Sequence, residues 1–242
     1  MRHQPSGPVV VHGHHEHRSV VGGQARAAVF GVSDGLVSNI SLILGFAGSG
    51  ADASVVRLAG LAGLLAGAIS MGAGEWVSMT AQNELIEREL DLERRELARN
   101  PEAETAELTR LYVSRGVPVD PARQVAEAVM REPTTALNVH AQEELGVTPD
   151  TLANPWIVAL LSFAAFAIGA ALPVLPWFVG SGDAAVAASL AVGVVAASVV
   201  GVLIARYAER GLIRSAIRQV LILLFACAVT YGVGRAIGIN VG

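Results

Sequence analysis

The sequence predicts an all-α polytopic membrane protein with five transmembrane helices and an inserted cytoplasmic helical domain. Of its 242 residues, 52% are apolar and only 16% are charged, well below the roughly 25% charged residues of an ordinary soluble domain. The charges are also unevenly placed. Long charge-free runs alternate with charged stretches, and residues 81–154 hold 15 of the 21 carboxylates together with 8 arginines. That segment is therefore expected in water and the rest in lipid.

Five apolar runs are candidates for the membrane spans, because a helix needs about 20 mostly apolar residues to cross a bilayer. They lie between charged residues at Arg26–Asp52, Arg57–Glu84, Asp150–Asp183, Asp183–Arg206 and Arg218–Arg235. The last run is short, but its flanking arginines can extend to the interfaces, so it still spans. We expect helices 1 and 2 within residues 25–80 and helices 3 to 5 within residues 155–242.

Arginine placement orients these spans, since cytoplasmic loops carry an excess of positive charge. The N-terminal segment and the fourth connection are the arginine-rich ones, with Arg2, Arg18 and Arg26 in the first and Arg206, Arg210, Arg214 and Arg218 in the second. We therefore expect the N-terminus, residues 81–154 and the fourth connection in the cytoplasm, and the C-terminus outside. The all-arginine, Ala/Gly/Val-rich composition, without an organelle-targeting signal, favours a bacterial inner membrane.

Helix start and stop signals subdivide residues 81–154. The second membrane helix is expected to continue to about Arg99. Further helices are predicted from Asn100-Pro101 to near Gly116, from Asp120-Pro121 until Pro133 interrupts it, and over 135–145 with Gly146 as C-cap. Their apolar stripes predict packing as a small bundle.

Several classes of function find no support in the composition. A net charge of −4 gives no case for nucleic-acid binding. The single cysteine, Cys227, excludes a disulfide framework and a Cys-rich zinc site, and its apolar surroundings indicate packing. No Walker A, Gly-x-Ser-x-Gly or Cys-x-x-Cys pattern occurs, which argues against an ATP-driven pump, a hydrolase or a redox enzyme. No prosthetic group is expected.

The first 24 residues form a polar, His-rich segment that we expect to be a disordered tail. They lack the apolar core of a cleavable signal peptide, so the first span is expected to direct insertion. The cluster His12–His17 either binds divalent metal weakly or has no ligand role, and the sequence leaves both interpretations open.

Three residues inside the first two spans are candidates for metal chemistry. Asp34 is costly in lipid unless it faces a partner or a polar cavity, so it is a functional candidate, with a hydrogen bond to a neighbouring helix as the alternative. Met71 lies one turn before Glu75 on the same helical face. Thioether and carboxylate together suit a divalent ion that must bind and leave. Packing is the alternative for Met71, and a charge at the helix end is the alternative for Glu75.

The second span also carries a row of small residues at Gly63, Gly67, Ser70 and Gly74. This spacing predicts close packing against another membrane helix, which in a dimer could belong to the other subunit.

Carboxylates recur on the helices predicted for residues 81–154. Glu93 and Glu96 share one helical side, the next helix adds Glu104 and Glu107, and the last places His140 and Glu144 four residues apart. For a single glutamate, a solvated face with ion pairs is the simpler interpretation. Three helices that each offer oxygen ligands, one with an imidazole, can also converge on Fe²⁺, Mn²⁺ or Zn²⁺.

Three motifs occur in order along the chain. They are Ser33-Asp34-Gly35-Leu36-Val37-Ser38-Asn39, then Ser70-Met71-Gly72-Ala73-Gly74-Glu75-Trp76-Val77-Ser78 followed by Gln82-x-Glu84, and Glu143-Glu144-Leu145-Gly146. Together they resemble the signatures of the vacuolar iron transporter (CCC1-like) family. The resemblance spans about residues 25–240 and implies five membrane helices, a homodimer and proton-coupled export of Fe²⁺ or Mn²⁺ from the cytoplasm.

The resemblance also implies roles for individual residues. Asp34 and Met71 resemble ligands of the translocation path near the dimer interface. Five glutamates resemble the metal-collecting carboxylates of the family's cytoplasmic domain: Glu93, Glu96, Glu104, Glu107 and Glu144. His140 stands where the family pattern has a methionine, and imidazole accepts Zn²⁺, Fe²⁺ and Mn²⁺ alike.

Two functions follow as hypotheses. The first is a secondary transporter that exchanges cytoplasmic Fe²⁺ or Mn²⁺ for protons, with lipid, metal ions, protons and a second copy of the chain as its partners. The second is a membrane-anchored metal sensor or store without transport. The intramembrane carboxylate of Asp34 favours the first, because an anchor has no need of it.

Overall fold

The computed structural model describes residues 23–147 and 152–239, and every regular element in these ranges is helical. Five helices are long and apolar enough to cross a membrane. They are α1 (Gly23–Gly48), α2 (Ala53–Arg99), α6 (Pro155–Ala171) continued by the 3-10 segment Leu172–Phe178, α7 (Gly182–Tyr207) and α8 (Leu212–Ile239). The predicted all-α class with five membrane helices is confirmed. Most of the His-rich tail, residues 1–22, lies outside the described residues.

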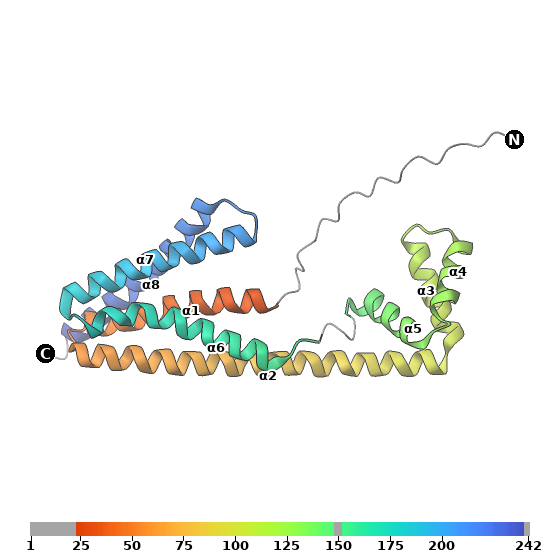
Figure 1. Ribbon diagram of the computed structural model, residues 1–242, viewed down its shortest axis with the longest axis horizontal. Coiled ribbons are helices and arrows are strands. Elements are labelled where there is room, and N and C mark those ends of the chain that lie inside the picture. The colour runs from red at the N-terminus through yellow and green to blue at the C-terminus, as the bar shows by residue number, and fades with distance from the viewer. Residues whose placement is uncertain (1–22, 148–151, 240–242) are drawn as a thin grey trace, which may run out of the picture.

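The helix α2 is the longest element, with 47 residues, and it joins the two parts of the molecule (Figure 1). Its first half packs with the other spans. Its second half runs on alone, as predicted, to the small helices α3 (Pro101–Ser114), α4 (Val119–Val129) and α5 (Pro133–His140). The second half consists mostly of Glu, Arg, Leu and Ala, which are strong helix formers. It ends where Pro101 follows, because proline disfavours helical geometry in the residue before it.

Two of the predicted helix starts need correction, and part of the last predicted helix is of another type. The helix α4 begins at Val119, after Pro118, so Asp120-Pro121 lies inside its first turn instead of capping it. Pro133 starts the last α-helix, where the Glu132 side chain accepts hydrogen bonds from the backbone N–H groups of Thr134 and Thr135. The segment Ala141–Leu145 is a π-helical turn, and Gly146 ends it with a φ of 67°, the left-handed conformation expected of its C-cap.

Close backbone contacts hold the membrane helices together. The helix α1 packs against α2, α6, α7 and α8. A Cβ atom placed on Gly35 of α1 would lie 2.2 Å from the carbonyl oxygen of Phe166, and one on Gly169 of α6 would lie 2.1 Å from that of Val32. Only glycine permits this approach, which yields van der Waals contact where lipid supplies no hydrophobic driving force.

The row of small residues on α2 packs within the chain over part of its length. A Cβ atom on Gly67 would lie 2.2 Å from the ring of Phe166 in α6, and one on Gly63 would lie 2.5 Å from the side chain of Leu42 in α1. Gly74 has open space in front of it. The prediction of close helix packing therefore applies to Gly63 and Gly67, and their neighbours are helices of the same chain.

A buried amide joins three of the spans. The Nδ2 group of Asn39 in α1 donates to the carbonyl oxygen of Gly60 in α2 at 3.1 Å and to that of Ala170 in α6 at 2.7 Å. Asn39 is 2% exposed. Such interhelical hydrogen bonds in a membrane contribute about 0.6 kcal/mol on average, and here they fix the relative positions of α1, α2 and α6.

Candidate metal centre

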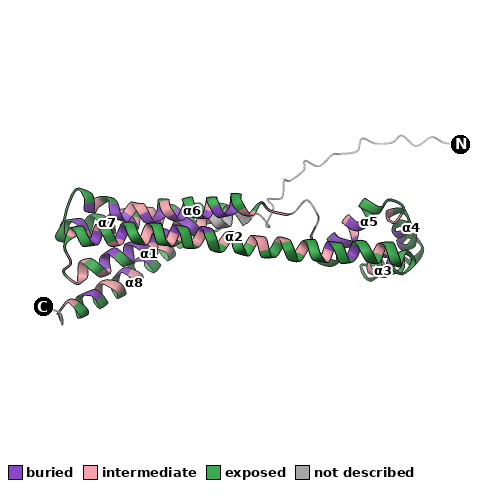
Figure 2. Ribbon diagram, turned by 90° about the horizontal axis from the view of Figure 1, so that it is seen from below, coloured by how far each residue is buried: buried purple, intermediate pink, exposed green. Residues whose placement is uncertain are grey.

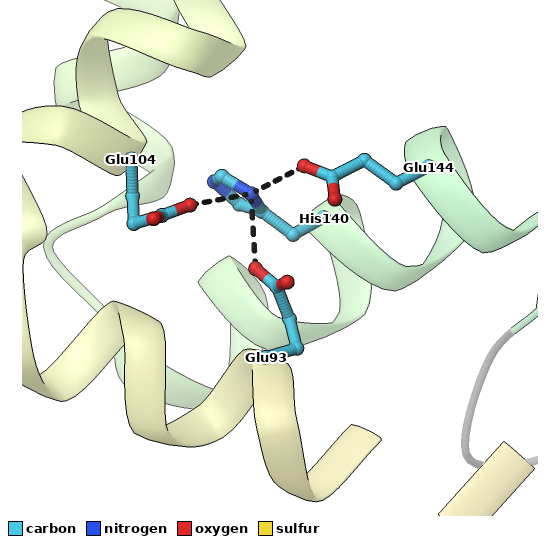
Figure 3. Close-up of side chains that lie close together, drawn as sticks. All are labelled: Glu93, Glu104, His140 and Glu144. Atoms are coloured by element: carbon cyan, nitrogen blue, oxygen red, sulfur yellow. Dashed lines mark hydrogen bonds and ion pairs between the residues drawn. The ribbon is translucent and has the colours of Figure 1, made fainter. Parts of the chain in front are cut away.

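Four side chains from different parts of the chain converge where α3 and α5 pack on α2 (Figure 3). Glu93 comes from α2, Glu104 from the first turn of α3, His140 from the end of α5 and Glu144 from the π-helical turn. One possible ligand atom from each lies within 4.8 Å of the other three. Glu93, Glu104 and His140 are buried, and Glu144 is exposed, so the cluster opens to water on one side. Figure 2 shows that the helices around it, α3, α4 and α5, carry both buried and exposed stretches.

The geometry centres on one imidazole nitrogen. The Nδ1 atom of His140 lies 3.2 Å from Glu93 Oε1, 3.2 Å from Glu144 Oε1 and 3.7 Å from Glu104 Oε2. One N–H group cannot donate to three carboxylates at once, and Glu93 Oε1 has no hydrogen-bond partner although it is buried. Three carboxylates facing at most one positive charge leave an excess of negative charge, which a divalent cation would compensate.

The spacing is close to that of an occupied site. Ligand atoms lie about 2.0–2.2 Å from a divalent first-row metal, so they are separated by about 3.4 Å in a tetrahedral site and by about 4.4 Å when opposite in an octahedral one. The observed limit of 4.8 Å requires side-chain shifts on the order of an ångström or less for either geometry. A set of one nitrogen and three oxygens suits Fe²⁺, Mn²⁺ and Zn²⁺.

The protonation of the cluster follows from its burial. Loss of hydration, and then the negative charge of Glu144, raise the pKa of Glu93 from 4.5 to about 7, against the opposing effect of His140. Burial also raises the pKa of Glu104. Without a metal the cluster therefore retains protons near neutral pH. An arriving cation has to displace them, so metal and proton compete for the same oxygens.

The two remaining predicted carboxylates lie outside this group. Glu96 and Glu107 are exposed and are not among the four side chains that converge. Their charges still act on it, because both raise the pKa of Glu104. Glu107 also approaches Arg110, at 4.0 Å. Spacing along a helix did not separate these outer carboxylates from the inner ones, since that depends on how α3 packs on α2.

One supporting contact was not identified from the sequence. Arg115, just after α3, forms an ion pair with Glu143 in the π-helical turn. It ties that turn to α3 and so holds the neighbouring Glu144 beside Glu104. The two partners are 28 positions apart, and no motif joins them.

Asp34 and Met71 line two neighbouring cavities in the membrane part. The first, of about 350 Å³, lies on the α1–α2 face and is also lined by Ser38, Ser70 and Gly63. The second, of about 670 Å³, extends toward α7 and α8. Asp34 is exposed, and its carboxylate makes no hydrogen bond or ion pair with the described residues. Met71 also packs beside Ala68 and Phe166, so its packing interpretation and its position beside Asp34 are compatible.

Glu75 lies apart from these cavities. Beside it in the chain, the ring of Trp76 contacts that of Trp156 at the start of α6, with centroids 5.5 Å apart. Tryptophan is enriched at the membrane–water interface, so the Trp76–Trp156 pair indicates that this part of α2 lies at the interface. The geometry thus favours a charge at the membrane–water interface, in the middle of the unbroken helix α2, as the interpretation of Glu75.

The fold and the two sites describe an integral membrane protein with five spans and an extramembranous cluster suited to divalent metal. Comparison with known proteins narrows this class. The model of the VIT family matches residues 25–235, and the chain belongs to that family. This confirms the family resemblance of its three motifs.

The curated relatives agree with this assignment. A vacuolar iron transporter of Acanthamoeba castellanii is 34% identical over 236 residues, covering 94% of this chain and 80% of the relative. Vacuolar iron transporter 1 of Oryza sativa subsp. japonica is 30% identical, covering 93% and 90%. Both organisms are eukaryotes, so these relatives lend no support to the predicted bacterial inner membrane.

Proposed function

We propose that this protein is a secondary transporter that exports cytoplasmic Fe²⁺, Mn²⁺ or both in exchange for protons. The observation that carries the proposal is the unpaired carboxylate of Asp34, which lines two cavities together with Met71 inside the membrane bundle. A carboxylate in that position is costly unless it serves an ion path. Membership of a family whose relatives are named iron transporters supports metal as the ion.

The two sites would bind the ion in succession. The cluster of Glu93, Glu104, His140 and Glu144 would collect the ion from the cytoplasm, with Glu96 and Glu107 as an outer acidic rim. Asp34 and Met71 would then bind it within the membrane. Because a carboxylate binds either a metal ion or a proton, Asp34 would release its proton when metal arrives and take one up when metal leaves, which couples the two flows.

A homodimer fits the open side of this path. The cavity on the α1–α2 face is exposed in the single chain, and Leu58, Leu65 and Ile69 of α2 are also exposed, at 68%, 55% and 61%. A second copy packed against this face would enclose Asp34 and Met71 between two subunits and shield the ion from lipid.

The alternative function is a membrane-anchored metal store or sensor. It is favoured by the completeness of the collecting cluster, which needs no residue from the membrane part. Under that function Asp34 would be structural, although the described residues offer its carboxylate no structural partner.

The deciding experiment is metal uptake into proteoliposomes with an acidic interior, with Fe²⁺, Mn²⁺ and Zn²⁺ measured separately. We expect Fe²⁺ or Mn²⁺ to enter as protons leave, and uptake to stop when the pH gradient is collapsed. Metal binding without uptake would establish the store. Reporter fusions at residue 242 test the orientation, and activity of a cytoplasmic reporter there would contradict the proposed topology.

A further inference from the structure

The end of α7 and the start of α8 line a cavity of about 930 Å³. It adjoins the larger of the two cavities beside Asp34, with which it shares Ile204, Ala208, Arg218 and Ile222. Three arginines line it: Arg210 in the connection, and Arg214 and Arg218 four residues apart on one face of α8. The connection lies at the end of the bundle from which α2 extends toward α3, α4 and α5 (Figure 1). The arginines therefore gather at one edge of the membrane-spanning region.

These positive charges have no counter-charge in the described part of the chain. No carboxylate lies within 4.0 Å of Arg210, Arg214 or Arg218, and the polar side-chain contact found there is a weak one at 3.4 Å from Arg218 Nη2 to Ser215 Oγ. In residues 81–147, by comparison, four of the eight arginines approach a carboxylate: Arg88, Arg94, Arg110 and Arg115. The cavity thus concentrates unpaired guanidinium groups.

The rest of the lining is aliphatic. Ile204 of α7 and Ile217, Leu221 and Ile222 of α8 complete the cavity. Ile217 and Leu221 are 52% and 60% exposed, on a helix apolar enough to span a bilayer, so they face lipid. One end of the cavity is cationic, and the other continues into the hydrocarbon region.

We propose that this cavity binds the headgroup of an anionic phospholipid from the adjacent leaflet. The phosphate would accept hydrogen bonds from the arginines, whose planar guanidinium groups match phosphate oxygens in pairs. The acyl chains would lie along Ile217 and Leu221. Basic pockets between membrane helices are suited to such headgroups, and a free soluble anion would make no use of the aliphatic half.

The test uses the full-length protein purified in detergent, with lipid retention measured by native mass spectrometry and thermal stability measured in parallel. Phosphatidylglycerol and cardiolipin are compared with phosphatidylcholine and with inorganic phosphate. The variant replaces Arg210, Arg214 and Arg218 by Gln. The matched control is Arg206→Gln, since Arg206 is an exposed arginine at the same end of α7 that does not line the cavity.

We expect retention of the anionic lipids, and a roughly 100-fold loss of affinity in the triple variant, at about fivefold for each arginine near a membrane surface. Arg206→Gln should change the affinity for the anionic lipids less than threefold. Single Arg214→Gln keeps the test decisive if the triple variant fails to fold, because it alone should weaken binding about fivefold. Equal retention by wild type and Arg214→Gln, equal losses in Arg206→Gln and Arg214→Gln, or saturation by inorganic phosphate would overturn the proposal.

Discussion

The cluster of Glu93, Glu104, His140 and Glu144, here called the outer cluster, and the membrane site at Asp34 and Met71 both offer carboxylates to a cation. The outer cluster is complete within one chain, and the membrane site is not. Glu93, Glu104 and His140 are buried against one another, and their ligand atoms already lie close enough for an ion. Asp34 is exposed, and no second carboxylate of the described chain joins it and Met71 at the cavities. The cluster is thus preorganised within one chain, whereas the membrane site depends on what packs against it. This suits a tight collecting site and a path that must release its ion.

Replacing Asp34 by Asn should have the largest effect. The change keeps the size of the side chain but removes its charge and its proton exchange at a site where water poorly replaces an anionic ligand. Transport in proteoliposomes should fall to background, by on the order of 100-fold or more, while the outer cluster still binds metal. Asp183→Asn, at the start of α7, is the control. Transport at a near wild-type rate would mean that Asp34 is structural, and the store function would gain.

Removing the three carboxylates that converge on His140 should abolish metal collection and only slow transport. Calorimetry on the full chain should show loss of this site when Glu93, Glu104 and Glu144 are replaced by Gln, each lost ligand costing about 10-fold or more in affinity. Glu96→Gln with Glu107→Gln is the matched control, and it should cost less than 10-fold in total. Equal losses in both variants would show that negative charge alone holds the ion, and that the convergence of the four side chains does not contribute.

Gly67 tests how far packing within the chain fixes the membrane site. Gly67→Ala pushes a methyl group into the Phe166 ring, and such overpacking costs about 1–3 kcal/mol. Gly74→Ala meets open space and should leave the thermal midpoint unchanged. If the two variants unfold alike in detergent, the contact between α2 and α6 is looser than described. A larger residue, as in Gly67→Leu, should also displace the wall of the α1–α2 cavity and weaken any dimer formed there.

The smallest expected effect is the pH dependence of stability in the metal-free helices around Glu93, which are the second half of α2 and α3 to α5. Burial raises the pKa of Glu93 to about 7 from 4.5 in the unfolded chain. The contribution of Glu93 to the free energy of unfolding is therefore fully present below pH 4.5, and it is lost as the pH rises from 4.5 to 7. Glu132 does not interfere, because hydrogen bonds from Thr135 and Thr134 lower its pKa to about 2, and its stabilisation is lost only below pH 4.5.

Hydrogen exchange across residues 84–145 measures this dependence. Protection without metal should decrease between pH 5 and 7.5 after correction for the intrinsic rate, and Glu93→Gln should remove most of the decrease. Added Mn²⁺ should reverse the trend, since metal binding tightens as the oxygens lose their protons. A flat profile in the wild type would place Glu93 in contact with water.

The sequence predicted the spans, the length of α2 and the approximate positions of the outer helices, because hydropathy and proline placement are local signals. It also predicted every member of the outer cluster, Glu93, Glu104, His140 and Glu144. It did not separate Glu93 and Glu104 from Glu96 and Glu107, since that depends on which side of α3 meets α2. The contact of Gly67 with Phe166, 99 positions away in the chain, likewise follows only from tertiary packing.

The unbroken course of α2 sets the distance between the two sites. Met71 and Glu93 are 22 positions apart on one helix, which is about 33 Å at 1.5 Å per residue. Charges in water are screened beyond about 8 Å at physiological ionic strength, so over the aqueous part of this distance an ion in the cluster exerts little electrostatic effect on the membrane site. Under the proposed function, an ion that leaves the cluster therefore has to diffuse across this distance before it binds beside Asp34 and Met71.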